Sequence, residues 1–65
     1  MNWDQVKGNW KQVSGEAQKQ WGKLTGDDVS QIKGERTKLS GRLQELYGYS
    51  KDQADKEIDS WLQRH

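Results

Sequence analysis

The sequence contains no cysteine and no proline, and its single histidine is the last residue, His65. Without cysteine, no disulfide bond and no cysteine-based zinc site can brace the fold. Without proline, nothing in the chain forces a helix to break. No run of apolar residues reaches a length of five. We therefore expect neither a transmembrane helix nor a secretory signal in this sequence, and we expect a cytoplasmic location.

Hydrophobic residues are also scarce, at 29% of the 65 residues against 32% that are charged. A chain of this size buries only about 60% of the surface that its unfolded form exposes, so its core is thin. Four tryptophans and two tyrosines supply large apolar groups that can anchor such a core. We predict one domain over residues 1–65, held together mainly by aromatic side chains.

The charges nearly balance, with a formal net charge of +1. Nucleic-acid-binding domains usually carry a much stronger basic bias. We therefore expect no nucleic-acid partner and no membrane partner, and we expect a monomer. The sequence does not identify any other partner.

Apolar residues recur at helical spacing throughout the chain, and no segment alternates with the period of a strand. The pattern predicts an all-α fold with helices near residues 3–21, 26–33, 35–47 and 51–63. The second and third of these are either separate or one helix bent at Gly34. The residues predicted to form the core are Trp3, Val6, Trp10, Val13, Trp21, Ile32, Leu39, Leu43, Tyr47, Ile58 and Trp61.

Two stretches of the sequence match at an offset of 26 residues. Residues 8–22 read GNWKQVSGEAQKQWG, and residues 34–48 read GERTKLSGRLQELYG. Each stretch has glycine at its first, eighth and fifteenth positions. The match indicates an old duplication of a helical hairpin.

The outer glycines of each stretch fall at predicted helix ends or junctions. Gly22 and Gly48 each follow an aromatic residue that ends an apolar stripe, which is where a left-handed glycine commonly ends a helix. Gly8 and Gly34 are expected to mark a kink or a junction.

The middle glycines, Gly15 and Gly41, are predicted to lie inside helices, on the side opposite the apolar stripe. A glycine inside a helix costs about 0.5–1 kcal/mol relative to alanine. Three explanations stay open: inheritance from the ancestral hairpin, close packing between hairpins or against a partner, and a chain selected to unfold readily. This back face is our candidate interaction surface.

Two helix starts have the spacing of a capping box, in which an N-cap hydroxyl and a side chain three residues later bond each other's backbone N–H. Thr25 with Asp28 forms one such pair, and Ser50 with Gln53 forms the other. Both pairs predict that a helix begins directly after the hydroxyl residue.

Residues that carry chemistry are few and scattered. No phosphate-binding or dinucleotide-binding glycine motif is present. Asp52, Asp55 and Asp59 are expected to form a solvated helix face, and His65 is expected to be solvated. We therefore predict no catalytic residue, no cofactor and no metal site, and we predict that the protein is not an enzyme.

The stretches GNWKQVSGEAQKQWGKLTGDD, residues 8–28, and LYGYSKDQADKEIDSW, residues 46–61, resemble the CsbD-like family of small bacterial stress-response proteins. The likeness extends over about residues 2–62. It implies two packed helical hairpins related by approximate duplication, in a SAM-domain-like arrangement. It also implies a bacterial cytoplasmic protein made in general stress or stationary phase, and it supplies no catalytic or binding residues.

Two functions fit these observations. In its hydrophilicity and glycine content the chain is similar to hydrophilins, which protect other proteins during water loss, so it is expected to be a non-enzymatic protectant under osmotic or drying stress. The alternative is an interaction module that binds a protein or a nucleic acid through the back face marked by Gly15 and Gly41.

Overall fold

The computed structural model describes residues 1–64, which form five helices. Residues 1–64 contain no strand, which confirms the all-α prediction. The helices are α1 (Trp3–Gly8), α2 (Trp10–Gln20), α3 (Gly26–Ile32), α4 (Arg36–Tyr47) and α5 (Lys51–Arg64).

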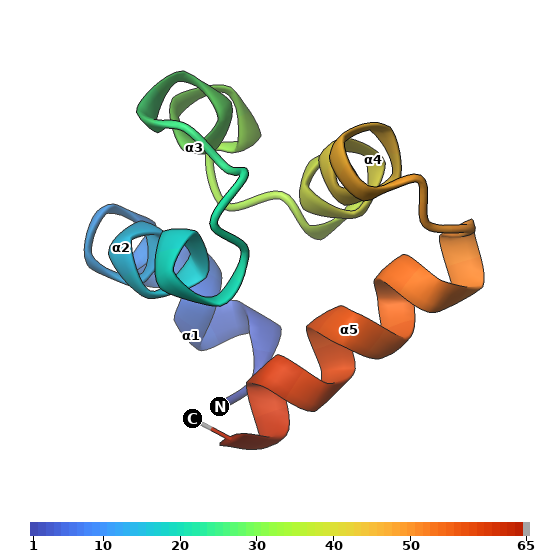
Figure 1. Cartoon of the computed structure of the whole chain (residues 1–65). Helices are drawn as coiled ribbons and strands as arrows, with labels where there is room; N and C mark the ends of the chain where they lie inside the picture. The colour runs from blue at the N-terminus through green and yellow to red at the C-terminus, as the bar shows by residue number, and fades with distance from the viewer. Residues whose placement is uncertain (65) are drawn as a thin grey trace.

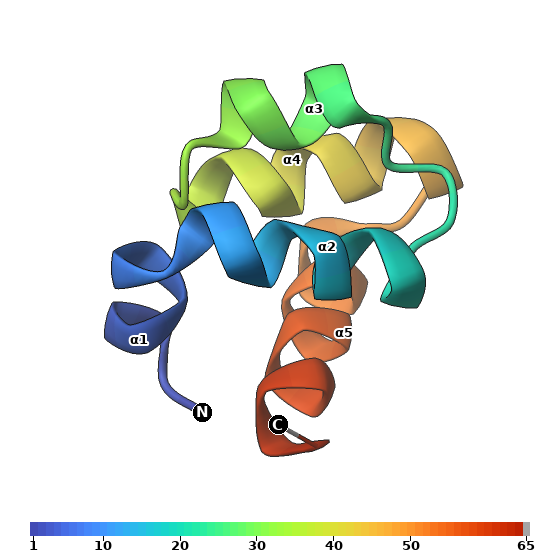
Figure 2. The same cartoon turned by 90° about the vertical axis from the view of Figure 1, so that its left-hand side faces the viewer.

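Helices α3 and α4 lie side by side and run in opposite directions, and α5 leaves the end of α4 at a steep angle and packs against it (Figures 1 and 2). The start of the chain lies beside the end of α5, because the Met1 ammonium donates a hydrogen bond of 2.9 Å to the Leu62 carbonyl. The bounds of α2 and α4 follow the 26-residue offset. A SAM-domain-like duplication of whole hairpins remains a prediction.

The helix predicted over residues 3–21 is wrong as a single element, because it breaks at Asn9, where φ is −117° and ψ is 29°. The break is set by tertiary contacts of Trp3 and Trp10. Their indole N–H groups donate to the carbonyls of Gly34, at 2.9 Å, and Val29, at 2.8 Å. The two indole rings lie against each other across the break, with centroids 6.4 Å apart.

The two middle helices are separate. Lys33 ends α3 in the left-handed conformation, with φ of 54°, and Gly34 follows with φ of 79°. Two successive left-handed residues reverse the chain direction, so a single helix bent at Gly34 is excluded.

The glycines that follow α2 and α4 differ in conformation. Gly48 ends α4 with φ of 71°, as predicted. The same prediction for Gly22 is wrong, because α2 ends at Trp21 in an extended conformation and Gly22 has no positive φ. The N–H of Leu24 bonds the Trp21 carbonyl at 3.0 Å, so the chain turns at once and buries Leu24 in the core.

The capping box of Thr25 and Asp28 is complete, with its two backbone N–H bonds at 3.2 and 3.0 Å. The second box is half formed. Ser50 Oγ accepts the N–H of Gln53 at 3.1 Å, but the Gln53 side chain donates to Glu57 instead. A further box that the sequence analysis above did not predict joins Asn2 and Gln5 at the start of α1.

At the centre of the core, Trp21 and Trp61 pack edge to face, with ring centroids 5.2 Å apart. Trp3, Trp10 and Tyr47 lie at the margin and are only half-buried, because each has a polar atom bonded near the surface. The buried apolar residues are Val6, Val13, Ala17, Trp21, Leu24, Val29, Ile32, Leu39, Leu43, Ala54, Ile58, Trp61 and Leu62.

Candidate functional site

No group of histidine, aspartate or glutamate side chains in residues 1–64 is placed to hold a metal ion. The acidic face predicted on α5 is partly used by an ion pair, because Asp59 bonds the Arg36 guanidinium at 2.7 Å. Arg36 also donates to the Asp55 carbonyl at 3.3 Å, so it joins the start of α4 to α5. His65 lies outside the described residues.

The surface formed by residues 1–64 exposes no large hydrophobic side chain. None of the helices described is both long enough and apolar enough to cross a membrane. The surface feature that stands out is a groove of about 490 Å³ between α3 and α4. Its lining residues are Gln31, Ile32 and Lys33 from α3 and its end, and Lys38, Gly41, Arg42 and Glu45 from α4.

Gly41 opens this groove. A Cβ at this position would meet no atom within 4 Å, so it would lie in open space. The lining residues of α4 fall on successive helical turns, from Lys38 through Gly41 to Glu45. The groove therefore runs along α4, with the backbone of Gly41 uncovered partway along it.

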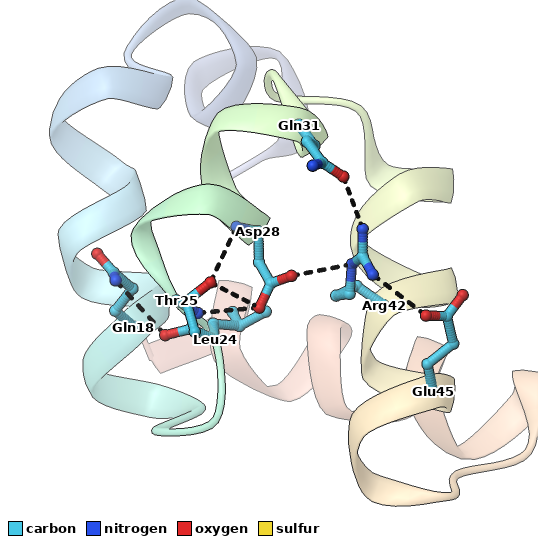
Figure 3. Close-up of polar contacts among 7 residues, drawn as sticks. All are labelled: Gln18, Leu24, Thr25, Asp28, Gln31, Arg42 and Glu45. Atoms are coloured by element: carbon cyan, nitrogen blue, oxygen red, sulfur yellow. Dashed lines mark hydrogen bonds and ion pairs between the residues drawn. The ribbon is translucent and has the colours of Figure 1, made fainter.

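Arg42 is held in place from both helices (Figure 3). Its Nε lies 3.2 Å from Asp28 Oδ1, its Nη2 donates to Gln31 Oε1 at 2.8 Å, and its Nη1 lies 3.2 Å from Glu45 Oε2. These bonds tie α3 to α4 and fix the guanidinium at the groove wall.

Asp28 serves both the helix cap and the Arg42 network. Its carboxylate accepts hydrogen bonds from the backbone N–H of Thr25 and from the Thr25 hydroxyl. The backbone bond has the larger effect, and together with the hydroxyl bond and the charge of Arg42 it lowers the pKa of Asp28 below its ordinary value. The carboxylate therefore stays charged at neutral pH and keeps both contacts.

Positive charge gathers at the end of the groove near the turn between α3 and α4. The Lys38 ammonium bonds Glu35 at 2.9 Å in an exposed pair. That bond and the charges of Lys38, Lys7 and Lys33 lower the pKa of Glu35. Among residues 1–64, no carboxylate lies within ion-pair distance of Lys33.

The structure does not bring Gly15 and Gly41 to one groove. Gly15 is exposed on α2 and does not line the groove, although it too has open space where a Cβ would lie. Close packing within the described chain therefore explains neither glycine. Of the lining residues, Gly41 was singled out from the sequence as part of an interaction surface, and Ile32 as part of the core. The partners of Arg42 come from two helices, so most of its contacts could not be predicted from neighbouring residues. The exception is the pair of Arg42 and Glu45, whose spacing of three residues places them side by side on one helix.

Comparison of the sequence with those of known proteins relates this chain to small bacterial proteins. A family model described as CsbD-like matches residues 4–56. Over all 65 residues the chain is 58% identical to the UPF0337 protein YjbJ of Escherichia coli O6:H1, covering 94% of that protein. It is 55% identical to UPF0337 protein ECA0631 of Pectobacterium atrosepticum, again covering 94%. It is 48% identical to UPF0337 protein pc0632 of Protochlamydia amoebophila, covering 98%.

Proposed function

The chain belongs to the CsbD-like family, and from this premise we propose that it is a non-enzymatic stress-response protein that shields other proteins during osmotic or drying stress. We propose that it acts in the cytoplasm, as a monomer and as one domain over residues 1–65. The shield is hydrophilin-like in purpose: it keeps partly unfolded proteins apart as water is withdrawn.

The observation that carries this proposal is the surface. No large hydrophobic side chain of residues 1–64 is exposed, and the tryptophans at the centre of the core are almost fully buried. A protein without apolar patches offers no hydrophobic surface on which partly unfolded proteins can adhere. Such a molecule can occupy the space between aggregation-prone proteins without itself joining the aggregate.

The charge distribution supports the same role. The chain carries 11 basic and 10 acidic residues. A surface with both signs and a small net charge has no strong long-range preference for acidic or basic proteins. A shield that must serve many proteins benefits from this neutrality.

The folded form is the form that we propose to be active, because the structure buries a continuous core. Gly15 and Gly41 lower its stability, at about 0.5–1 kcal/mol each relative to alanine. Neither position has an atom within 4 Å of where a Cβ would lie, so alanine fits both without a clash. The double variant Gly15→Ala/Gly41→Ala is therefore a more stable protein with the same surface.

The test is drying and rehydration of a labile enzyme with this protein or with an equal mass of lysozyme, a stably folded control. Circular dichroism on the same samples reports whether the protein remains helical. We expect the enzyme to recover clearly more activity with this protein than with lysozyme. Equal recovery would overturn the proposal.

Two variants then separate the mechanisms. A folded shield predicts that the Gly15→Ala/Gly41→Ala variant protects as well as the parent chain. Protection that falls in the stabilised variant would show that unfolding is needed. Rearranging the exposed charged residues at constant composition should also leave recovery unchanged, because the shield makes no specific contact.

A further inference from the structure

We propose that the groove between α3 and α4 binds a short, extended peptide segment that carries an acidic side chain. The ligand carboxylate would lie between Lys33 and Lys38, and the peptide backbone would pass over Gly41. This inference goes beyond the shield role, which requires no specific contact, and it does not depend on it.

The dimensions of the groove suit a few residues of extended chain. From Lys38 to Glu45 the groove follows eight residues of α4, which are seven steps of about 1.5 Å, or about 10 Å in all. An extended peptide advances about 3.3 Å per residue, so about three residues fit along it. The volume of about 490 Å³ lies within the range of about 300–1,000 Å³ typical of ligand sites.

Gly41 gives the peptide access to the helix. A side chain at this position would enter open space at the groove, and no neighbouring atom within 4 Å requires glycine there. Glycine permits close approach of another backbone. Gly15 has equally open surroundings, and what distinguishes Gly41 is that it lines the groove, where a binding role requires it to be small.

The charges favour a carboxylate at the end of the groove near the α3–α4 turn. Lys33 has no carboxylate within ion-pair distance among residues 1–64. Lys38 is paired with Glu35, but both side chains are more than half exposed. Exposed pairs contribute little free energy, so a ligand carboxylate can replace Glu35 at small cost.

The rest of the groove favours a peptide over a free anion. Gln31 and Glu45 present oxygen atoms that already accept from Arg42. Each oxygen retains capacity for a second donor, such as a peptide N–H. A small anion would use only the lysines, whereas a peptide also meets these acceptors and the uncovered backbone of Gly41.

The binding test is a ¹⁵N NMR titration of the whole chain with acetyl-Glu-Asp-Glu-amide, and with acetyl-Gln-Asn-Gln-amide as the neutral control. We expect saturable shifts of the amides of Lys33, Gly41 and Arg42 with the acidic peptide, weakened by added salt. Equal affinity for the neutral peptide, or shifts that map elsewhere, would overturn the proposal. Acetate that reproduces the same shifts at the same affinity would also overturn it, by reducing the site to one for a small anion.

Gly41→Leu and Gly15→Leu form a matched pair, because both positions lie inside helices with open space around them and only Gly41 lines the groove. Gly41→Leu should lower the affinity at least tenfold, whereas Gly15→Leu should leave it unchanged. Equal effects of the two substitutions would contradict the proposed site.

Lys33→Gln is a second test that remains informative if Gly41→Leu fails to fold, because Lys33 lies after the end of α3 and its replacement leaves the helices intact. It should weaken binding of the acidic peptide, while Lys19→Gln, on an exposed residue of α2, should not. Unchanged binding by Lys33→Gln would count against the placement of the carboxylate. Lys33→Gln adds no apolar side chain, so it should still protect a labile enzyme during drying, and this proposal and the shield proposal fail independently.

Discussion

Gly8 and Gly34 hold the same position in the two copies of the repeat, and their surroundings differ completely. Gly8 ends α1 at the surface, with no atom within 4 Å of where a Cβ would lie. Gly34 is buried in a left-handed conformation, and a Cβ there would lie 3.3 Å from both Lys7 Cα and Trp10 Cβ. A residue that the sequence repeats therefore need not have a repeated role.

The difference arises because one junction packs on the other. The break between α1 and α2 lies against the turn between α3 and α4, and the Trp3 indole donates to the Gly34 carbonyl across this contact. Gly34 lies on the inside of this contact, and Gly8 does not. The N-terminal helices supply the side chains of Trp3 and Trp10, and the second copy supplies the backbone of Gly34 that these side chains cover.

The aromatic residues that end each copy differ in the same way. Trp21 is 2% exposed and packs against Trp61 at the centre of the core. Tyr47 is half-buried, stacks on Tyr49 with centroids 5.2 Å apart, and accepts the backbone N–H of Lys23 at 3.1 Å. The first anchors the core, and the second anchors the connection between α2 and α3 to the end of α4.

The largest expected effect compares these two aromatics. Trp21→Ala should lower the free energy of unfolding by about 3–5 kcal/mol, because it empties the centre of the core. A domain of this size has little more than that in total, so the variant should be largely unfolded. Tyr47→Ala should cost about 1–2 kcal/mol and stay folded. Urea unfolding followed by circular dichroism measures both.

Trp21→Phe is the control for this comparison. The buried Trp21 Nε1 has no hydrogen-bond partner among residues 1–64, so phenylalanine loses ring volume but no hydrogen bond. Its loss should be well below that of Trp21→Ala. If Tyr47→Ala cost as much as Trp21→Ala, the assignment of one residue to the core and the other to the margin would fail.

The next effect compares the two glycines. Gly34→Ala should cost about 2–3 kcal/mol, because alanine is strained at φ of +79° and its Cβ presses on the backbone of Lys7. Gly8→Ala should change the stability by no more than about 0.5 kcal/mol, because its surroundings are open. Both values follow from urea midpoints measured under the same conditions.

Gly48→Ala separates strain from contact. Gly48 has φ of +71° but no atom within 4 Å of where its Cβ would lie, so alanine there meets strain alone. We expect a loss of about 1 kcal/mol, between the other two. A Gly34→Ala loss no larger than that of Gly48→Ala would show that the contact with Lys7 and Trp10 contributes nothing.

The smallest effect compares the capping pairs by pH. The pKa of Asp28 is lowered in the folded state, so its contribution to stability is present above its unfolded pKa and is lost as the pH falls through its folded pKa. The pair of Ser50 and Gln53 contains no titratable group. Below about pH 4, Asp28→Asn should therefore reduce the slope of unfolding free energy against pH.

Gln53→Ala is the control for the pH series, and it should keep the slope of the parent chain. Glu35, whose pKa is also lowered, continues to contribute a loss of the same sign in every variant. Parent and Asp28→Asn curves that run parallel from pH 5 to pH 2 would contradict the assigned role of Asp28.

Local features were predictable because they depend on neighbours along the chain. The apolar period placed helices close to α3, α4 and α5, and the Thr25 capping box and the left-handed Gly48 were read correctly. A kink or junction at Gly8 was expected, but the complete break of the helix at Asn9 was not, and the extended end of α2 at Trp21 was missed. Both depend on where another helix presents a carbonyl group or an apolar surface.

The candidate site also combines a residue that the sequence predicted with residues that it did not. Gly41 stood out from the sequence as a glycine inside a helix on the polar side. Its partners did not, because Gln31 and Lys33 come from the end of α3 and meet α4 only after the chain has reversed at Gly34. Gly15, predicted to share one face with Gly41, does not line this groove.

By itself, the sequence determined that this protein is all-helical, that Trp21, Trp61 and aliphatic residues form a small core, and which family it belongs to, because periodicity and local motifs are properties of contiguous residues. Tertiary structure alone decided which repeated glycine is required, which aromatic is central, and that a groove opens at Gly41. These features depend on contacts between residues far apart in the chain. Positions that match in the two copies of the repeat have different neighbours in the folded chain, so their side chains have different roles.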